Sequence, residues 1–204
     1  VVYPIKIFVV FLHEVSHAVA AILTGGEVVS ITVNPNEGGL CITRGGSRFL
    51  TLSAGYFGSM VWGGFFLIVA CRTRLDRPLC WALAIGIAVI AVLYMRNVFG
   101  FLFALAAAAA AGFAAWKLSD IVCEAILVLV GLASCSYAIL DIVSDIFTLR
   151  KTCPTDATML AEYTGIPSYF WGALWISLSI ICTYYCLRIA LGSEVVGLTR
   201  SRKA

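Results

Sequence analysis

Both histidines of the chain lie in one five-residue segment, His13-Glu14-Val15-Ser16-His17. The neighbouring residues are apolar and favour a helix, in which residues four apart share one face. Both imidazoles can then bind one metal ion, and Glu14 is close enough to act as general base on a water molecule. Two histidines with a third protein ligand and one open position suit Zn²⁺. The segment therefore predicts zinc-dependent hydrolysis, with His13 and His17 as metal ligands and Glu14 as the catalytic base.

A chance match is the alternative, because the pattern specifies only three positions. The segment lies in an apolar stretch from Pro4 to Leu23, which Gly25-Gly26 ends. Inside a membrane span each ionisable side chain costs at least about 2 to 3 kcal/mol and is usually functional. Three such groups within five residues therefore favour a metal site over a chance match.

The composition indicates an integral membrane protein. Hydrophobic residues make up 61% of the 204 residues and charged residues only 12%, and the mean hydropathy is +0.99, far from the usual globular composition. The net charge is only +3, and no basic cluster is interleaved with aromatic residues, which excludes a nucleic-acid surface. The eight cysteines show no C-x-x-C pair and lie mostly in apolar runs, so we interpret them as small hydrophobic residues. The expected partners are the lipid bilayer and other membrane segments.

Long uncharged stretches predict the spans that must position the motif. The uncharged stretches are 49–71, 78–95, 97–116, 125–140 and 163–187. Most of these stretches are close to the length of roughly 20 residues that a spanning helix needs. The fourth extends to a helix over about 121–148, and the segment from Pro4 to Leu23 is the sixth span. One helix over 79–116 would be about 57 Å long, so it must break at Arg96-Asn97. The fold prediction is an all-α polytopic membrane protein with six transmembrane helices, forming a single domain over residues 1–204.

A short β-hairpin is expected after the first span. Residues 28–33 are mostly β-branched, 34–39 contain turn residues, and 40–43 return as a second strand. The hairpin could present an edge strand to an unwound substrate, which makes Val28, Val29, Ser30 and Ile31 candidate substrate-binding residues. Gly55, Ser59 and Gly63 repeat every four positions, which favours close helix packing, and Gly55 and Ser59 are also candidates for lining a substrate cleft.

A third metal ligand should come from another span. In a six-span topology His17 lies about 9 Å from its helix end, Asp141 about 10 Å from the matching end and Asp145 about 5 Å. Asp141 is therefore the expected ligand. Asp145 is either an outer partner or alternative ligand or a charge at the lipid headgroups. Thr155-Asp156 is interpreted as a turn or N-cap before a short helix over 157–163, with no catalytic role.

These residues resemble the site-2 protease family of intramembrane zinc metalloproteases, especially its poorly characterised B-type branch. The resemblance covers most of the chain and rests on the histidine motif, the hairpin after Gly25-Gly26, Leu140-Asp141, and the segments 155–162, 164–167 and Trp171. It implies a membrane-embedded peptidase in which zinc is held by two histidines and an aspartate. The better-known members carry N-x-x-P-x-x-x-L-D-G, whereas here Ile142 follows Leu140-Asp141, and neither the Asn nor the Pro is present.

Two functions follow as hypotheses. The first is a zinc endopeptidase that cleaves transmembrane segments of membrane-protein substrates, with Zn²⁺ on His13, His17 and Asp141. The alternative is a catalytically silent membrane chaperone, scaffold or transport component, which the missing N-x-x-P favours and the intact Glu14 disfavours.

The orientation in the membrane stays open. Nine Lys and Arg residues on the side of the termini, against five on the hairpin side, place the termini in the cytoplasm. The family resemblance places the hairpin side there instead. Because the chain begins at Val1, an upstream segment is also expected.

Overall fold

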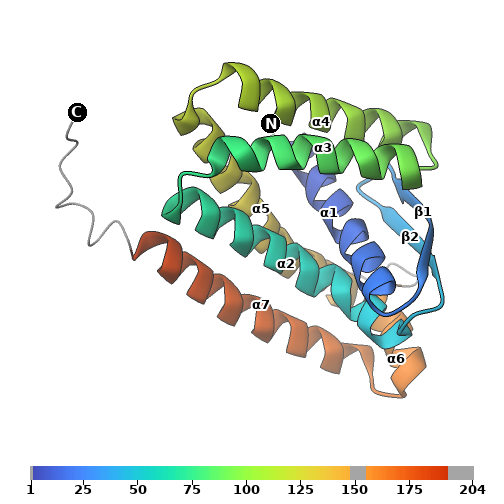
Figure 1. Ribbon diagram of the computed structural model, residues 1–204. Helices are drawn as coiled ribbons and strands as arrows, with labels where there is room; N and C mark the ends of the chain where they lie inside the picture. Colours follow the sequence, from blue (N-terminus) through green and yellow to red (C-terminus); the bar gives the residue numbers. More distant parts are fainter. Residues whose placement is uncertain (1, 148–154, 193–204) are drawn as a thin grey trace.

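The computed structural model describes residues 2–147 and 155–192 (Figure 1). In this part the chain forms seven helices and two strands. In chain order they are α1 Val2–Leu23, β1 Glu27–Val33, β2 Gly39–Arg44, α2 Arg48–Arg72, α3 Asp76–Tyr94, α4 Val98–Lys117, α5 Asp120–Phe147, α6 Asp156–Thr164 and α7 Ser168–Leu191. The expected six long helices and the hairpin are confirmed, and the expected short helix over 157–163 is α6.

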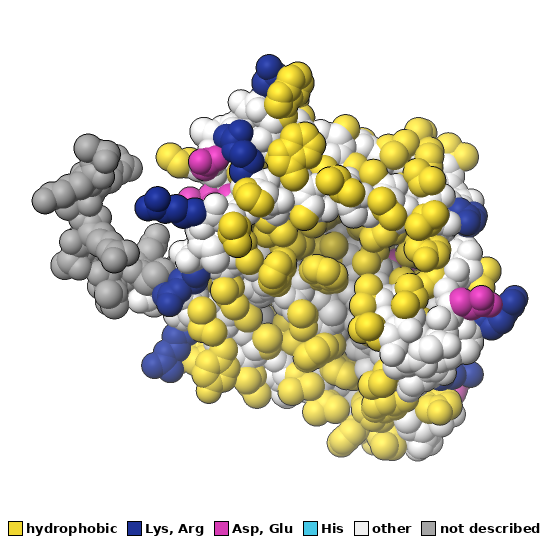
Figure 2. All heavy atoms as spheres, in the orientation of Figure 1, with side chains coloured by type: hydrophobic (Ala, Val, Ile, Leu, Met, Phe, Trp, Pro, Cys, Tyr) yellow, Lys and Arg dark blue, Asp and Glu magenta, His cyan; other side chains and the backbone are white. Residues whose placement is uncertain are grey.

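Six helices are long and apolar enough to cross a membrane, namely α1, α2, α3, α4, α5 and α7. Many of their large apolar side chains are exposed, including Ile85, Val92 and Ile180. Hydrophobic side chains spread over most of the visible face in Figure 2, and charged side chains gather at its periphery. Lipid tails can cover such a surface, because its side chains are apolar. The backbone polar groups of each span form hydrogen bonds within its own helix and need no water.

The first span ends where its glycines predict. Gly25 has a φ of 84°, a left-handed conformation that is accessible to glycine. The N–H of Gly26 donates to the carbonyl of Ala21 over 2.8 Å, which closes the last turn. The chain then reverses into the hairpin, in which β1 and β2 pair antiparallel with Val33 opposite Gly39. The hairpin packs against α1.

The predicted break after α3 occurs at residues 95–97. The chain continues into α4, which packs along α3 (Figure 1). The connection also contacts the hairpin: the N–H of Arg96 donates to the carbonyl of Ile31 over 3.1 Å, and Met95 forms a parallel bridge with Ile31. This short connection therefore lies along the outer edge of β1 as a partial third strand.

Helix α2 lies at the centre of the bundle and packs against α1, α5, α6 and α7. Small residues allow this close packing. A methyl group on Gly58 would overlap Ser16 of α1, and one on Gly63 would lie 2.8 Å from the carbonyl oxygen of Gly131 in α5. The spacing of small residues thus corresponds to helix contacts, as expected for packing in lipid.

Candidate metal and catalytic site

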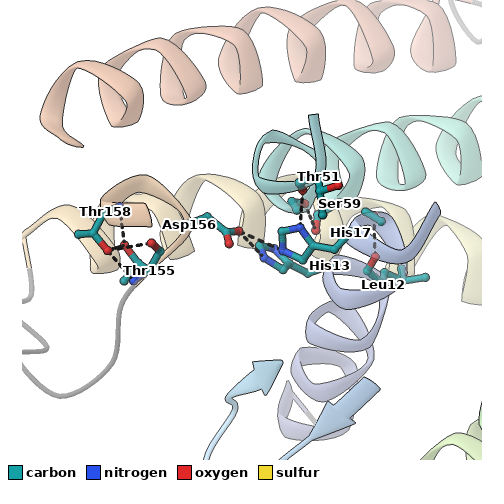
Figure 3. A network of polar contacts seen from close by, with 10 residues as sticks. Leu12, His13, His17, Thr51, Ser59, Thr155, Asp156 and Thr158 are labelled. Atoms are coloured by element: carbon teal, nitrogen blue, oxygen red, sulfur yellow. Dashed lines mark hydrogen bonds and ion pairs between the residues drawn. The ribbon is translucent and has the colours of Figure 1, made fainter. Parts of the chain in front are cut away.

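Two histidines and one aspartate converge at the hairpin end of the bundle. One carboxylate oxygen of Asp156, Oδ2, lies 3.0 Å from His13 Nε2 and 3.1 Å from His17 Nε2. One potential ligand atom from each residue lies within 4.8 Å of the others. Figure 3 shows the Asp156 side chain pointing from α6 toward the two imidazoles of α1. The three residues could therefore hold one metal ion.

The imidazole of His17 is held in one orientation. Its Nδ1 donates to the backbone carbonyl of Thr51 in α2 over 2.6 Å, so Nε2, which faces Asp156 Oδ2, is the ring nitrogen that could bind a metal. Metal-binding histidines are usually oriented by such a bond from the second ring nitrogen. The ring of His13 packs edge-on against Tyr56, with the ring centroids 5.3 Å apart. Helix α2 thus orients both imidazoles that α1 provides.

Asp156 is held by the start of α6. The Thr155 hydroxyl accepts from the N–H of Thr158, and the Thr158 hydroxyl accepts from the N–H of Thr155, an arrangement that stabilises a helix start. A buried cluster fastens α6 to α2, α5 and α7, and it consists of Leu52, Tyr56, Ile142, Leu160, Trp171 and Trp175. The short helix therefore presents a carboxylate to the imidazoles although it does not span the membrane.

Asp156 is stabilised as a carboxylate. Burial alone would raise the pKa of Asp156, but the charge of His17 and hydrogen bonds from both imidazoles outweigh it and hold that pKa below its ordinary value. The first turn of a helix also favours a negative charge. An ionised carboxylate is the form that binds a metal cation.

The site leaves no room for a side chain at position 55. A Cβ atom on Gly55 would overlap His13 Nε2 and lie 2.6 Å from His17 Cε1. Gly55 was expected to contribute to helix packing and a substrate cleft, and it packs against both potential ligands. Ser59 is buried, and its hydroxyl donates to the carbonyl of Gly55 over 3.0 Å. Ser59 therefore supports the helix segment behind the site.

The second strand covers Glu14. A methyl group on Gly39 would overlap the Glu14 carboxylate, which is only 5% exposed. Cys41 lies two positions further along β2, on the same strand face as Gly39. Burial, together with the charges of Glu14 and Asp156, raises the pKa of the Cys41 thiol to about 12. The strand face formed by Gly39 and Cys41 therefore lies against Glu14.

Asp156, and not the expected Asp141, is the carboxylate that meets the imidazoles among the described residues. The structure places Asp156 against the imidazoles, whereas Asp141 of α5 is half-buried and lies within electrostatic range of His13 and Glu14. Asp141 does not belong to the His-Asp group found in the described residues. The depth comparison considered only spanning helices and so omitted α6. The segment Thr155-Asp156-Ala157 did carry a signal, because it was part of the family resemblance. The side chain of Asp145 lies outside the described part.

The candidate substrate-binding residues Val28 to Ile31 lie in β1. The outer edge of β1 is occupied at Ile31 by Arg96 and at Val33 by Asn97. Within the described residues no strand pairs with the outer edge of β2. In the described part of the chain, the outer edge of β2 is therefore unpaired, and Gly39 places this edge next to Glu14. Among the same residues, the outer edge of β1 is unpaired only before Ile31.

The donor set fits zinc. Two imidazole nitrogens and one carboxylate oxygen are three typical zinc ligands, and a fourth position for water completes a catalytic zinc site. The oriented His17 supplies one feature that such a site requires, a ligand held in a fixed position.

Searches of curated proteins and of solved structures found no match. A family model described as Peptidase M50B-like matches residues 1–186, which include α1, α6 and the whole candidate site. This agrees with the resemblance to site-2 proteases, and the six apolar helices agree with a membrane location. The chain is therefore a multi-pass integral membrane protein that belongs to the Peptidase M50B-like family.

Proposed function

We propose that the protein is an intramembrane zinc endopeptidase that cleaves transmembrane segments of other membrane proteins. The observation that carries the proposal is the convergence of His13, His17 and Asp156 beside Glu14. In this proposal these three residues hold the zinc ion, so Asp156 takes the role expected of Asp141. Residues 1–204 act as a single membrane-embedded domain.

Zinc in such a site polarises a carbonyl and makes water a better nucleophile. Glu14 takes a proton from the attacking water and passes it to the nitrogen of the departing amine. Its burial beneath Gly39 excludes bulk water from the carboxylate. The bond from His17 Nδ1 to Thr51 keeps the imidazole oriented throughout the reaction.

The substrate must be extended at the site, because a helical backbone hides its carbonyls in its own hydrogen bonds. An extended segment can pair with the outer edge of β2, which has no strand partner in the described part of the chain. Main-chain pairing of this kind binds a peptide with little dependence on its side chains. It would bring a scissile bond close to Glu14, since Gly39 begins this strand.

A catalytically silent membrane chaperone or scaffold remains the second candidate, and it predicts bound metal without turnover. The absent N-x-x-P motif favours this alternative, because an extended substrate segment needs polar partners that the missing Asn would provide. The buried Glu14 beside the histidines favours the peptidase instead.

The test compares wild type with Glu14→Gln, and with Glu162→Gln as a matched control on the exposed side of α6. Zinc is measured by mass spectrometry on purified protein, and cleavage is measured on a model transmembrane substrate in lipid. Loss of a general base should lower turnover by about 10²- to 10⁴-fold while zinc stays bound. A wild type without zinc refutes the proposal. A zinc-loaded wild type that cleaves no substrate favours the silent alternative.

A further inference from the structure

We propose that Asn97, in the connection between α3 and α4, is a positioning residue for hydrolysis, because it holds the hairpin so that Gly39 stays against Glu14. This inference rests on the proposed peptidase function. Asn97 was interpreted from sequence only as a polar break between two spans, and its side chain contacts none of the three potential metal ligands through a described hydrogen bond.

The side chain of Asn97 binds the backbone of β1 at two atoms. Its amide nitrogen donates to the carbonyl of Val33 over 2.5 Å, and its amide oxygen accepts from the N–H of Val33 over 3.2 Å. A side-chain amide can thus replace the neighbouring strand that Val33 lacks on this side. Val33 is fully buried, and backbone groups left without a partner there would be destabilising.

The position of Val33 determines that of Gly39. The two residues are direct partners across the hairpin, and Gly39 in turn packs on the Glu14 carboxylate. The N–H and C=O of Val33 both point toward Asn97. The two hydrogen bonds with Asn97 therefore form on one edge of β1, and Gly39 of β2 lies along the other edge. Asn97, Val33, Gly39 and Glu14 therefore form one continuous series of contacts from the α3–α4 connection to the base.

A glycine in α4 makes room for this contact. A Cβ atom on Gly100 would overlap the terminal methyl group of Met95 and would lie 2.6 Å from the amide oxygen of Asn97 and 3.2 Å from the N of Val33. Gly100 lies inside a helix, where glycine is less favourable than alanine. The glycine is explained by the close approach of the α3–α4 connection, with Met95 and Asn97, to β1.

The first experiment measures zinc, kcat and KM for Asn97→Ala and Asn97→Asp, with Asn36→Ala in the exposed hairpin turn as control. A displacement of about 1 Å at a reacting group can cost about 10²-fold in rate. We expect both Asn97 variants to retain zinc and to lose about 10- to 100-fold in kcat. Asp should not substitute for Asn, because a carboxylate cannot donate to the Val33 carbonyl. Asn36→Ala should behave as wild type.

A second pair of variants tests the same contact without changing Asn97. Gly100→Ala should reproduce the loss in kcat, and the helix itself should tolerate alanine. Gly112→Ala, in the same helix, meets no atom closer than 3.6 Å and should leave turnover unchanged. Equal turnover of Gly100→Ala and Gly112→Ala would overturn the proposal, as would loss of zinc in Asn97→Ala.

A double-mutant cycle tests the route through Gly39. Gly39→Ala should itself lower kcat, because its methyl group overlaps Glu14. If Asn97 acts through Gly39, Asn97→Ala should have a much smaller effect in the Gly39→Ala background than in wild type. Independent, multiplicative effects of the two substitutions would overturn the route, even if each variant is impaired.

The position of the hairpin can be followed without any proteolysis. Cys41 is half-buried on the face of β2 that packs toward Glu14, and its raised pKa keeps it a poorly reactive thiol. Alkylation of Cys41 by a membrane-permeant maleimide, read by peptide mass spectrometry, should be faster in Asn97→Ala than in wild type and unchanged in Gly112→Ala. Unchanged alkylation in Asn97→Ala refutes the positioning role. Faster alkylation in a protein that cleaves nothing supports the positioning of the hairpin and refutes only the peptidase function.

Discussion

Oδ2 of Asp156 lies 3.0 Å from Nε2 of His13 although the two residues are 143 positions apart in the chain. The contact joins the first spanning helix to a nine-residue helix near the other end of the chain. A spanning helix has a depth in the membrane that can be estimated from its sequence. The depth of α6 is set instead by its packing on α2 and α7.

Substitution of the two candidate aspartates should separate their roles. Asp156→Ala removes one of three proposed ligands and should purify with little zinc and no activity. Asp141→Ala should keep its zinc, because Asp141 stands outside the group of converging ligand atoms in the described residues. Asp145→Ala should also hold zinc. Mass spectrometry of the purified variants measures the metal. A zinc-loaded Asp156→Ala together with a metal-free Asp141→Ala would restore the assignment made from helix depth.

Gly55→Ala should weaken zinc binding even though residue 55 supplies no ligand. Its methyl group would overlap His13 Nε2 and approach His17 Cε1, so the imidazoles or α2 must shift. Gly86→Ala in α3 is the matched control, because a methyl group there meets nothing within 4 Å. Isothermal titration of zinc into the metal-free variants compares the two. Equal affinities would show that the site can absorb the extra methyl group.

Thr155→Ala should lower zinc affinity through the helix start that carries Asp156. Loss of an N-cap hydroxyl costs about 0.5 to 2 kcal/mol, which corresponds to about 2- to 30-fold in affinity if the whole cost falls on the metal-bound state. Thr155→Ser keeps the hydroxyl and should bind zinc as wild type does. Competition with a chromophoric chelator gives the affinities. A Thr155→Ser variant as weak as Thr155→Ala would point to the lost methyl group instead.

Arg77 should matter for stability and not for turnover. Its guanidinium donates to the carbonyls of Ala115 and Leu118, at the end of α4, and to Asp120 at the start of α5. Asp120→Ala breaks only an exposed ion pair and should cost at most about 1 kcal/mol. Arg77→Ala also removes the two carbonyl bonds and should cost about 1 to 3 kcal/mol more. Thermal unfolding in detergent measures both, and a larger loss in Asp120→Ala would contradict this division.

Much of the fold could be predicted because lipid imposes strong constraints on sequence. Each spanning helix needs a long apolar stretch, and the six predicted stretches became six helices. The hairpin could be predicted from β-branched residues around a turn, and the break near Asn97 from the length of residues 79–116. The spacing of His13 and His17 places both on one helix face whatever the rest of the chain does. These features depend on residues close together in the chain.

Only the tertiary structure decided which carboxylate meets the histidines and what Asn97 does. Asp141 and Asp156 are both acidic residues near the hairpin end of the bundle, so residue type alone does not distinguish them. The choice depends on how Leu160 and its aromatic neighbours dock α6 against α2 and α5. Asn97 likewise finds its partner, Val33, 64 positions away. Such contacts depend on the relative placement of whole elements, which local sequence patterns do not specify, because the packing energy that selects one placement is distributed over many residues distant in the chain.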